Sequence, residues 1–280
     1  MNKIKMREPG KVILWVGLGV LLLIEIYPIF WLLMSSIKGP DEFSLRPMYA
    51  LPRTFHWQNY VQAWTAGKMS TYFRNSVLAT FPAIALTMLL GVMAAFALEI
   101  LTWRLKSGVL FLFLAGIMVP AQIVLLPLFT MYYKLHLTNN LFGLILVYTV
   151  FGMPLTVFLM TSYMKAIPNE IIEAAIIDGA SIYQVFYKIV VPMVTNALVT
   201  LALVQFFFVW NDLLLSLTFI SDTNLRTVQT GLLSFVGQFG QREWGPTFAS
   251  IALTVIPTLL IYLFLNNKVI KGLTAGAVKG

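Results

Sequence analysis

The sequence contains no cysteine and has little charge. Of its 280 residues, 11% are charged and two are histidine, whereas soluble domains carry roughly 25% charged residues. Without cysteine there is no disulfide framework, thiolate nucleophile or thiolate metal ligand, and His56 and His136 are far apart in the sequence, so no metal site is predicted. No Gly-x-x-x-x-Gly-Lys-Ser/Thr run occurs, so the chain has no P-loop with which to hydrolyse ATP.

Hydrophobic residues, by contrast, make up 59% of the chain, and the mean hydropathy is +0.84. Several apolar runs reach the roughly 20 residues that a helix needs to cross a bilayer, and they lack the alternation of a barrel strand. The sequence therefore predicts an all-α membrane protein with about six spans. We expect these spans at Val12–Ile37, Val77–Ile100, Gly108–Tyr133, Leu141–Met164, Met193–Thr218 and Thr247–Leu265. The first run is too long for a cleaved signal peptide.

The distribution of positive charge indicates an orientation. The net charge is +8, but without a basic stripe or interleaved stacking aromatics it does not indicate nucleic-acid binding. With both termini in the cytoplasm, the inside loops hold the larger and more clustered set of Lys and Arg, as the positive-inside rule requires. That set is Lys3, Lys5, Arg7, Lys11, Arg104, Lys106, Lys165, Lys188, Lys268, Lys271 and Lys279.

The segment EAAIIDGASIYQVFYKIVVP, Glu173–Pro192, is too polar to span a membrane and too apolar for an ordinary soluble loop. After Pro168, helical spacing predicts a helix over Asn169–Ile177, ended by Gly179. A capping box that begins at Ser181 predicts a second helix. Two interpretations remain open: an amphipathic helix on the membrane surface, or a docking element for a soluble partner. The polar face carries acids and neither Lys nor Arg, which favours docking.

These residues also resemble a known family. EAA at 173–175, Gly179 and IVVP at 189–192 reproduce the spacing of the EAA loop of ABC-transporter permeases. Further segments resemble sugar permeases: NY at 59–60, YFRNS at 72–76, WNDLLLSL at 210–217 and GLTAGAVKG at 272–280. Together they resemble MalG-like permease subunits of binding-protein-dependent ABC carbohydrate importers. Val191 stands where Leu is commoner, and Asn196 where a second proline often follows Pro192, so both departures concern the kink of the fifth span.

The resemblance implies a type I ABC importer permease fold. The whole chain, 1–280, would form one transmembrane domain with a cytoplasmic coupling-helix loop at about 165–192. It implies an ATPase-coupling set in which Glu173 is the polar contact and Gly179 the turn. The complete set is Glu173, Ala174, Ala175, Asp178 and Gly179, with Ala174 and Ala175 as the surface of closest approach. It further places the C-terminal tail, with Gly272, Gly276 and Lys279, near the ATPase.

The implied partners are two copies of an ABC ATPase subunit, a second MalF-like permease subunit and an extracytoplasmic solute-binding protein. The implied location is the inner or plasma membrane of a prokaryote, in contact with membrane lipid. ATP and Mg would belong to the ATPase, and this chain would itself bind no cofactor. The loop at Ser221–Gly245 would reach toward the solute-binding protein, or it is a surface connection between two spans.

Four polar or amphipathic residues are placed to face an aqueous pathway: Gln122, Tyr148, Gln205 and Asn211. Their residue types suit sugars, which are bound by hydrogen bonds and aromatic faces, but periodicity does not show which face each occupies. Prolines at 82, 120, 127, 154 and 257 either break helices at a binding site or merely kink them.

The leading functional hypothesis is an ABC importer permease for a carbohydrate, specifically an oligosaccharide. Glu25, in the middle of the first span, raises an alternative, because intramembrane carboxylates are costly and indicate either function or a buried partner. It would be the titrating group of an ion-driven secondary transporter, or a structural hydrogen bond. A permease for a non-sugar solute such as glycerol phosphate is a further alternative, although such an ester favours Arg in the pathway and no span interior holds one. An intramembrane enzyme ranks last, because paired catalytic groups are missing.

Overall fold

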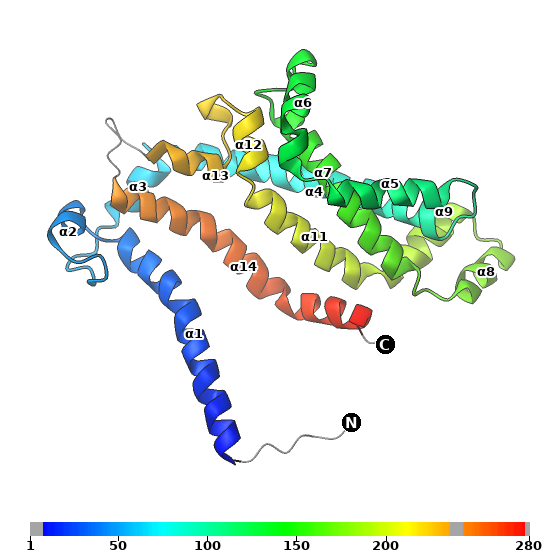
Figure 1. The fold of residues 1–280 in the computed structure, drawn as a ribbon, viewed down its shortest axis with the longest axis horizontal. Coiled ribbons are helices and arrows are strands. Elements are labelled where there is room, and N and C mark those ends of the chain that lie inside the picture. The colour runs from blue at the N-terminus through cyan, green and yellow to red at the C-terminus, as the bar shows by residue number, and fades with distance from the viewer. Residues whose placement is uncertain (1–7, 236–242, 278–280) are drawn as a thin grey trace. The chain divides into compact units, whose positions relative to one another are not determined.

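The computed structural model describes residues 8–235 and 243–277, and within these ranges the regular elements are helices, with no strand. The first half contains α1 (Glu8–Ser36), α2 (Pro40–Leu45), α3 (Gln58–Trp64), α4 (Met69–Glu99), α5 (Lys106–Met118), α6 (Ala121–Lys134) and α7 (Leu141–Met164). The second half contains α8 (Asn169–Ile177), α9 (Ile182–Gln184), the π-helix η1 (Val185–Val190), α10 (Val191–Met193), α11 (Thr195–Trp210), α12 (Leu214–Phe219), the 3-10 helix η2 (Thr223–Leu225), α13 (Val228–Gly231), the 3-10 helix η3 (Leu232–Phe235) and α14 (Trp244–Ala277). Figure 1 shows their order along the chain.

The chain divides into two compact units, Met1–Met69 with Leu232–Val255 and Ser70–Gly231 with Ile256–Gly280. In the first unit a buried lysine fixes the end of α1. Lys38 is 2% exposed, its Nζ donates to the carbonyl oxygen of Met48 over 2.7 Å, and it lies 5.8 Å from the ring centroid of Phe43. Burial lowers the pKa of Lys38, although the nearby Glu42 carboxylate acts to raise it. The charge is thus held by a carbonyl and an aromatic face.

Glu42 organises the loop after α1. Its Oε2 accepts from Arg46 Nη1 and from the backbone N–H of Arg53, each over 3.1 Å, and its Oε1 accepts from the N–H of Gly39 over 3.3 Å. Burial acts to raise the pKa of Glu42, but these donors outweigh it, and the pKa is lowered. The polar loop between the first two spans is therefore an ordered element built around one carboxylate.

Helices α4, α5, α7 and α11 form the body of the second unit, with small residues at close approaches. A Cβ on Gly91 of α4 would lie 2.4 Å from Thr156 Cγ2 of α7. A Cβ on Gly152 of α7 would lie 2.8 Å from Thr87 Cγ2 of α4 and 2.9 Å from Gln205 Oε1 of α11. Glycine is required at both positions because the neighbouring helices leave no room for a methyl group.

Four helices are long and apolar enough to cross a membrane, and there are six candidate spans if each of two bent pairs counts as one. The single helices cover the expected first, second, fourth and sixth spans. The second begins at Met69 rather than at residue 77, so it includes the polar residues Asn75 and Ser76. Both bind the loop after α12: Asn75 Nδ2 donates to the carbonyl oxygens of Asn224 and Arg226 over 2.8 and 3.0 Å, and Ser76 Oγ accepts from the N–H of Val228 over 2.9 Å.

The expected third span is not one straight helix. Helices α5 and α6 meet at an angle of 103°, and α6 turns away from α5 at this point (Figure 1). Val119 is extended, with ψ of 111°, because the residue before a proline is disfavoured in the helical region. Pro120 then caps α6. The other prolines noted in the sequence, at 82, 127, 154 and 257, lie inside continuous helices, so only Pro120 breaks a span.

The expected fifth span, Met193–Thr218, is interrupted at both ends. The Ile182–Met193 segment meets α11 at 75° next to Val194, so the kink is present although Asn196 replaces the second proline. At the other end α11 stops at Trp210 and α12 starts at Leu214. Asp212 separates them, since its carboxylate accepts from the N–H of Leu215 and of Ser216 over 3.2 and 2.9 Å, as an N-terminal capping residue does.

Candidate functional site

The first helix of the 165–192 loop has the predicted bounds and the predicted ending. Pro168 precedes α8 with ψ of 132°. At the other end the N–H of Ala180 donates to the carbonyl oxygen of Ala175 over 2.9 Å, and the N–H of Gly179 donates to that of Ile176 over 3.0 Å. This pair of bonds is a Schellman motif. Gly179 has φ of +83°, and its Cβ position meets nothing within 4 Å, so backbone conformation alone requires glycine there.

The second helix also starts as predicted. Ser181 Oγ accepts from the N–H of Gln184 over 3.4 Å, and Gln184 Oε1 accepts from the N–H of Ser181 over 2.8 Å, which completes the capping box. The helix then widens into the π-helix Val185–Val190, which the sequence did not indicate. Such segments occur mostly as single-turn bulges at functional sites.

The loop exposes one face and buries another. Glu173, Ala174 and Asp178 are exposed, whereas Ala175 is half-buried against the unit's apolar core. Large apolar side chains share the exposed face: Ile177 is 85% exposed and Tyr183 is 76% exposed. The loop thus exposes both acidic and large apolar side chains.

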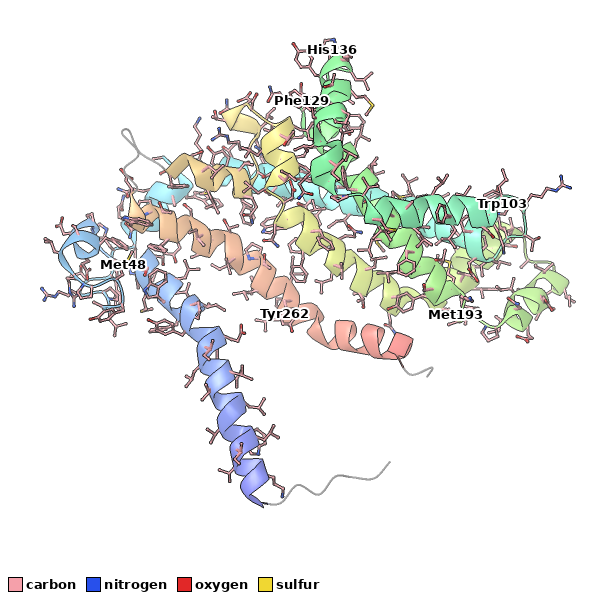
Figure 2. The ribbon with its side chains drawn as sticks, in the orientation of Figure 1. Met48, Trp103, Phe129, His136, Met193 and Tyr262 are labelled. Atoms are coloured by element: carbon pink, nitrogen blue, oxygen red, sulfur yellow. The ribbon has the colours of Figure 1, made fainter. Side chains whose placement is uncertain are left out.

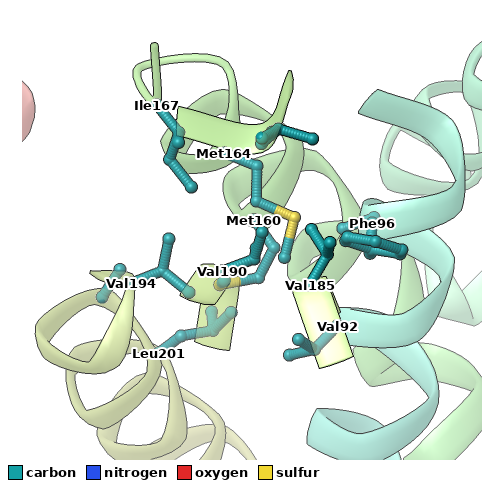
Figure 3. Packing of buried hydrophobic residues seen from close by; sticks show 12 residues of the cluster. Val92, Phe96, Met160, Met164, Ile167, Val185, Val190, Val194 and Leu201 are labelled. Atoms are coloured by element: carbon teal, nitrogen blue, oxygen red, sulfur yellow. The ribbon is translucent and has the colours of Figure 1, made fainter. Parts of the chain in front are cut away.

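The buried face joins the loop to the helices through a continuous apolar cluster, here called the loop-base cluster. Its residues are Val92, Ala95 and Phe96 of α4, Met160 and Met164 of α7, Ile167, Ile172 of α8, Val185 and Val190 of η1, Val194, and Ala197 and Leu201 of α11. Figure 3 shows these side chains pointing toward one another. Met160, Met164, Val185 and Val190 are fully buried. The cluster therefore joins α8 to three spans by close packing, and interiors of this kind transmit strain.

The turn between α4 and α5 lies at this same end of the second unit. Ile100 and Leu101 pack against the loop-base cluster, and Figure 2 labels Trp103 and Met193 at this end. Trp103 Nε1 donates to the carbonyl oxygen of Ala97 over 2.8 Å, which fixes the turn.

A cavity of about 300 Å³ lies between α5, α7, α11 and α12. Its lining residues are Gly116, Ile117, Val119, Tyr148, Phe151, Gly152, Pro154, Leu155, Gln205, Phe208, Val209, Asp212 and Leu215. Tyr148 Oη donates to Asp212 Oδ2 over 2.9 Å. Gln205, which is 3% exposed, donates through Nε2 to the carbonyl oxygen of Gly152 and to Thr156 Oγ1, each over 3.0 Å.

The structure thus brings two of the four predicted pathway residues, Tyr148 and Gln205, to one cavity and adds Asp212. Gln122 and Asn211 are exposed and do not line it; Asn211 instead accepts through Oδ1 from Gln229 Nε2 over 3.2 Å. Sequence reasoning missed Asp212, although Asn-Asp after a long apolar run is a turn signal.

The remaining predicted residues lie elsewhere. Glu25 is exposed on α1. Gly272 and Gly276 fall within α14, and Lys279 lies outside the described residues. In the part of the chain that the structure describes, no group of three or more His, Cys, Asp or Glu side chains could hold a metal ion.

These features define a class: a helical multi-pass membrane protein with an exposed, half-apolar helical loop at one end of its second unit. Comparison with known proteins then gives the family. Residues 87–274 match the family described as "Binding-protein-dependent transport system inner membrane component". The chain belongs to this family of ABC importer permeases and is therefore a multi-pass protein of the inner membrane.

Individual relatives agree with this assignment. The chain is 34% identical to the probable ABC transporter permease protein YurM of Bacillus subtilis (strain 168), over 97% of this chain and 89% of that protein. It is 32% identical to the diacetylchitobiose uptake system permease protein NgcG of Streptomyces coelicolor, over 91% of this chain and 85% of that protein. Among solved structures, a bacterial ABC transporter involved in the import of the acidic polysaccharide alginate matches with a TM-score of 0.84 at 20% identity, over 95% of this chain and 99% of that chain. The type I permease fold is confirmed.

Proposed function

We propose that this chain is the permease subunit of an ATP-driven ABC importer that moves a carbohydrate, most suitably an oligosaccharide, by alternating access. Family membership, together with the diacetylchitobiose uptake permease among its relatives, supports a sugar cargo. The family membership disfavours the ion-driven transporter with Glu25 as its titrating group. A phosphate ester is disfavoured because the described residues that line the cavity include no Lys or Arg, and phosphates are bound chiefly by such groups.

The observation that carries the mechanism is the 165–192 loop. Its exposed face, with Glu173, Ile177 and Tyr183, would seat in a groove of the ATPase subunit, and its buried face would pass the movement on through the loop-base cluster. A docked partner would cover the exposed apolar surface, which explains why it is tolerated outside the bilayer. Closure of the ATPase dimer would then shift the equilibrium between inward-open and outward-open bundles.

The assembly implied by this role contains more than one kind of subunit. We infer two ATPase copies, which bind ATP and Mg, a second MalF-like permease and an extracytoplasmic solute-binding protein. The helical tail with Gly272 and Gly276 would approach the ATPase. The basic residues of the α4–α5 turn, Arg104 and Lys106, and of the loop, Lys165 and Lys188, belong to segments at one end of the second unit. This supports a cytoplasmic location for that end.

The direct test is to change the turn of the coupling loop in the reconstituted complex. We expect Gly179→Asp and Glu173→Lys to lower sugar uptake and binding-protein-stimulated ATP hydrolysis by about tenfold or more, the scale on which an interface hot spot acts. Gly179→Asn is the matched control, since Asn and Asp both visit the left-handed conformation and Asn adds no charge to the docking face. Membrane insertion is measured for each variant by its yield in the membrane fraction. Full transport by Gly179→Asp would contradict the assignment of this loop as the coupling element.

A second measurement separates ATP-driven from ion-driven transport. Uptake into proteoliposomes is measured with ATP enclosed on the ATPase side and with an uncoupler added. We expect the uncoupler to leave uptake unchanged and Glu25→Gln to retain it. Uptake that needs an ion gradient but not ATP would restore the alternative function.

A further inference from the structure

The geometry points to a neutral-sugar subsite on this chain itself, in the cavity between α5, α7 and α11, formed by Tyr148, Gln205 and Asp212. It rests on the proposed function, because it names where a carbohydrate cargo would contact this subunit. Broken or interrupted helices line binding sites in transporters, and the cavity lies beside two such points. One is the break at Val119–Pro120, and the other is the interruption between α11 and α12.

The first requirement for such a site is unused hydrogen-bonding capacity, and Gln205 supplies it. This side chain is 97% buried, as its exposed fraction of 3% shows. Its Nε2 makes both of its donations to the protein, to Gly152 and Thr156. Its Oε1 accepts no hydrogen bond from the described residues, and it lies where a Cβ on Gly152 would be only 2.9 Å away. Gln205 lines the cavity, so this amide oxygen is available to accept from a sugar hydroxyl.

Asp212, which Tyr148 holds in place, adds a further acceptor beside this amide. The Asp212 carboxylate receives three donors, from Tyr148 Oη and from the N–H groups of Leu215 and Ser216. A carboxylate offers about four acceptor positions, so one is left for a ligand hydroxyl. Tyr148 Oη uses its proton on Asp212 and has the Ser216 side chain as a second hydrogen-bond partner, so it positions the carboxylate. Gln205 and Asp212 therefore accept hydrogen bonds from a ligand that is rich in hydroxyl donors.

The apolar walls suit the other face of a sugar. Phe151, Leu155 and Phe208 line the cavity, and most of its lining surface is apolar. Mostly apolar pockets with a few placed polar groups are the usual form of small-molecule sites. A volume of about 300 Å³ is at the lower end of the range for ligand pockets. The cavity would hold part of an oligosaccharide at a time.

The charge of the lining decides which sugars it favours. Asp212 is the single charged residue among the lining residues that the structure describes. A carboxylate or sulfonate group on a sugar would meet a like charge with no Arg or Lys to pair with. The subsite therefore favours neutral sugars over acidic ones, unlike the cargo of the alginate transporter that shares its fold.

The first test fills the cavity in the complete transporter. Leu155→Trp places an indole in the cavity, and Leu112→Trp, on an α5 position that is 68% exposed and outside the lining, is the matched control. The probes are radiolabelled maltotriose, cellobiose and N,N′-diacetylchitobiose, and the one that the cognate binding protein retains is used for uptake. We expect uptake to fall by about tenfold or more in Leu155→Trp only, since the lost contacts are those of a packed ligand pocket. Co-purification of each variant with the ATPase subunit checks that both variants still assemble.

The outcomes separate the two proposals. If the wild-type complex takes up none of the probes, the oligosaccharide function itself is wrong. If the wild type transports a probe and Leu155→Trp transports it equally well, the function stands and the subsite is overturned.

The second test measures the effect of the cavity's charge on thiol reactivity, with no sugar present. Because the native chain has no cysteine, Leu155→Cys can be labelled as the single thiol of this subunit, with the partner subunits made cysteine-free. We expect a cationic methanethiosulfonate reagent to react about tenfold or more faster than an anionic one of similar size, as a charged cleft attracts counter-ions. Adding Asp212→Asn, which removes the charge and keeps one of the two acceptor oxygens, should remove most of that preference. A thiol that does not react, or a preference unchanged by Asp212→Asn, would overturn the proposal.

Discussion

The two ends of α7 and α11 contrast sharply. At one end Met160 and Met164 of α7 meet Leu201 of α11 in the loop-base cluster, which is apolar and fully packed. At the other end Tyr148 of α7 and Gln205 of α11 line a cavity with unused hydrogen-bond acceptors. The same pair of helices is therefore close-packed where the 165–192 loop joins it, and it lines a cavity where α11 is interrupted.

This difference explains how one pair of helices can both move with the coupling loop and bind a small molecule. A close-packed end has low compressibility and moves as a unit with the loop attached to it. A cavity with a few polar groups in an apolar lining is the usual form of a site for small molecules. In the proposed transporter, movement would start at the packed end and change access at the hollow one. Substitutions should therefore separate into those that break coupling and those that change cargo.

The largest expected effect comes from truncating a buried side chain in the loop-base cluster. Met160→Ala removes a side chain with no exposed surface, and buried Met to Ala changes destabilise proteins by about 2–5 kcal/mol. We expect a lowered unfolding temperature in detergent and weaker coupling of ATP hydrolysis to uptake. The matched control is Met118→Ala, at a position that is 83% exposed. Equal effects of both substitutions would show that the loop-base cluster contributes no more to stability and coupling than an exposed position does.

Crowding the helix contact beside the hollow end should have the next largest effect. Gly152→Ala would place a Cβ 2.8 Å from Thr87 Cγ2 and 2.9 Å from Gln205 Oε1, and overpacking of this kind costs about 1–3 kcal/mol. We expect lower thermal stability together with lower uptake, because Gln205 must shift. Gly108→Ala is the control, since its Cβ would meet nothing within 4 Å. Unchanged stability in Gly152→Ala would contradict the close approach of α4, α7 and α11.

A smaller effect is expected from the second helix of the coupling loop. Ser181→Ala removes the capping oxygen that accepts from the N–H of Gln184, and loss of such a cap costs about 1 kcal/mol. We expect partial uncoupling with cargo preference unchanged. Hydrogen exchange of the backbone amides over Ile182–Gln184 gives a local readout. Protection in Ser181→Ala equal to that of wild type would show that the capping box contributes nothing.

The smallest effect is expected at Glu42, outside both ends. Its pKa is lowered in the folded protein, so its contribution to stability is present above its ordinary pKa of 4.5 and is lost as pH falls through the lowered value. Glu42→Gln should therefore unfold at a lower temperature than wild type at pH 7, and the difference should shrink as the pH is lowered below 4.5. A difference that is constant with pH would show that the charge of Glu42 is not involved.

The sequence predicted the coupling loop well because its signals are local. Pro168, Gly179 and the capping box at Ser181 act within four or five residues, and each has the predicted geometry. The half-burial of Ala175 was not predictable, because it depends on which helices lie beneath α8. The π-helix after Gln184 has no local signal either.

The cavity was predicted only in part for the same reason. Helical spacing cannot show that Tyr148 and Gln205 face one space while Gln122 and Asn211 do not. The interruption at Asp212 was missed because apolar residues continue after it, from Leu213 to Leu215. The sequence pattern therefore resembles one uninterrupted span. Length and apolarity predicted the third and fifth spans only as continuous apolar segments, and the bends of 103° and 75° within or beside them depend on local proline and capping chemistry.

The most direct test of the coupling claim compares exposed side chains from the two ends in the complete transporter. A photo-crosslinking amino acid is placed at Ile177, which is 85% exposed on the loop, or at Leu126 of α6, which is 75% exposed. Irradiation of the complex in membranes should crosslink position 177 to the ATPase subunit, with a yield that changes when ATP binds. Position 126 should give no such product. Crosslinking of the ATPase from position 126, or only lipid adducts from position 177, would contradict the assignment of the 165–192 loop as the coupling element.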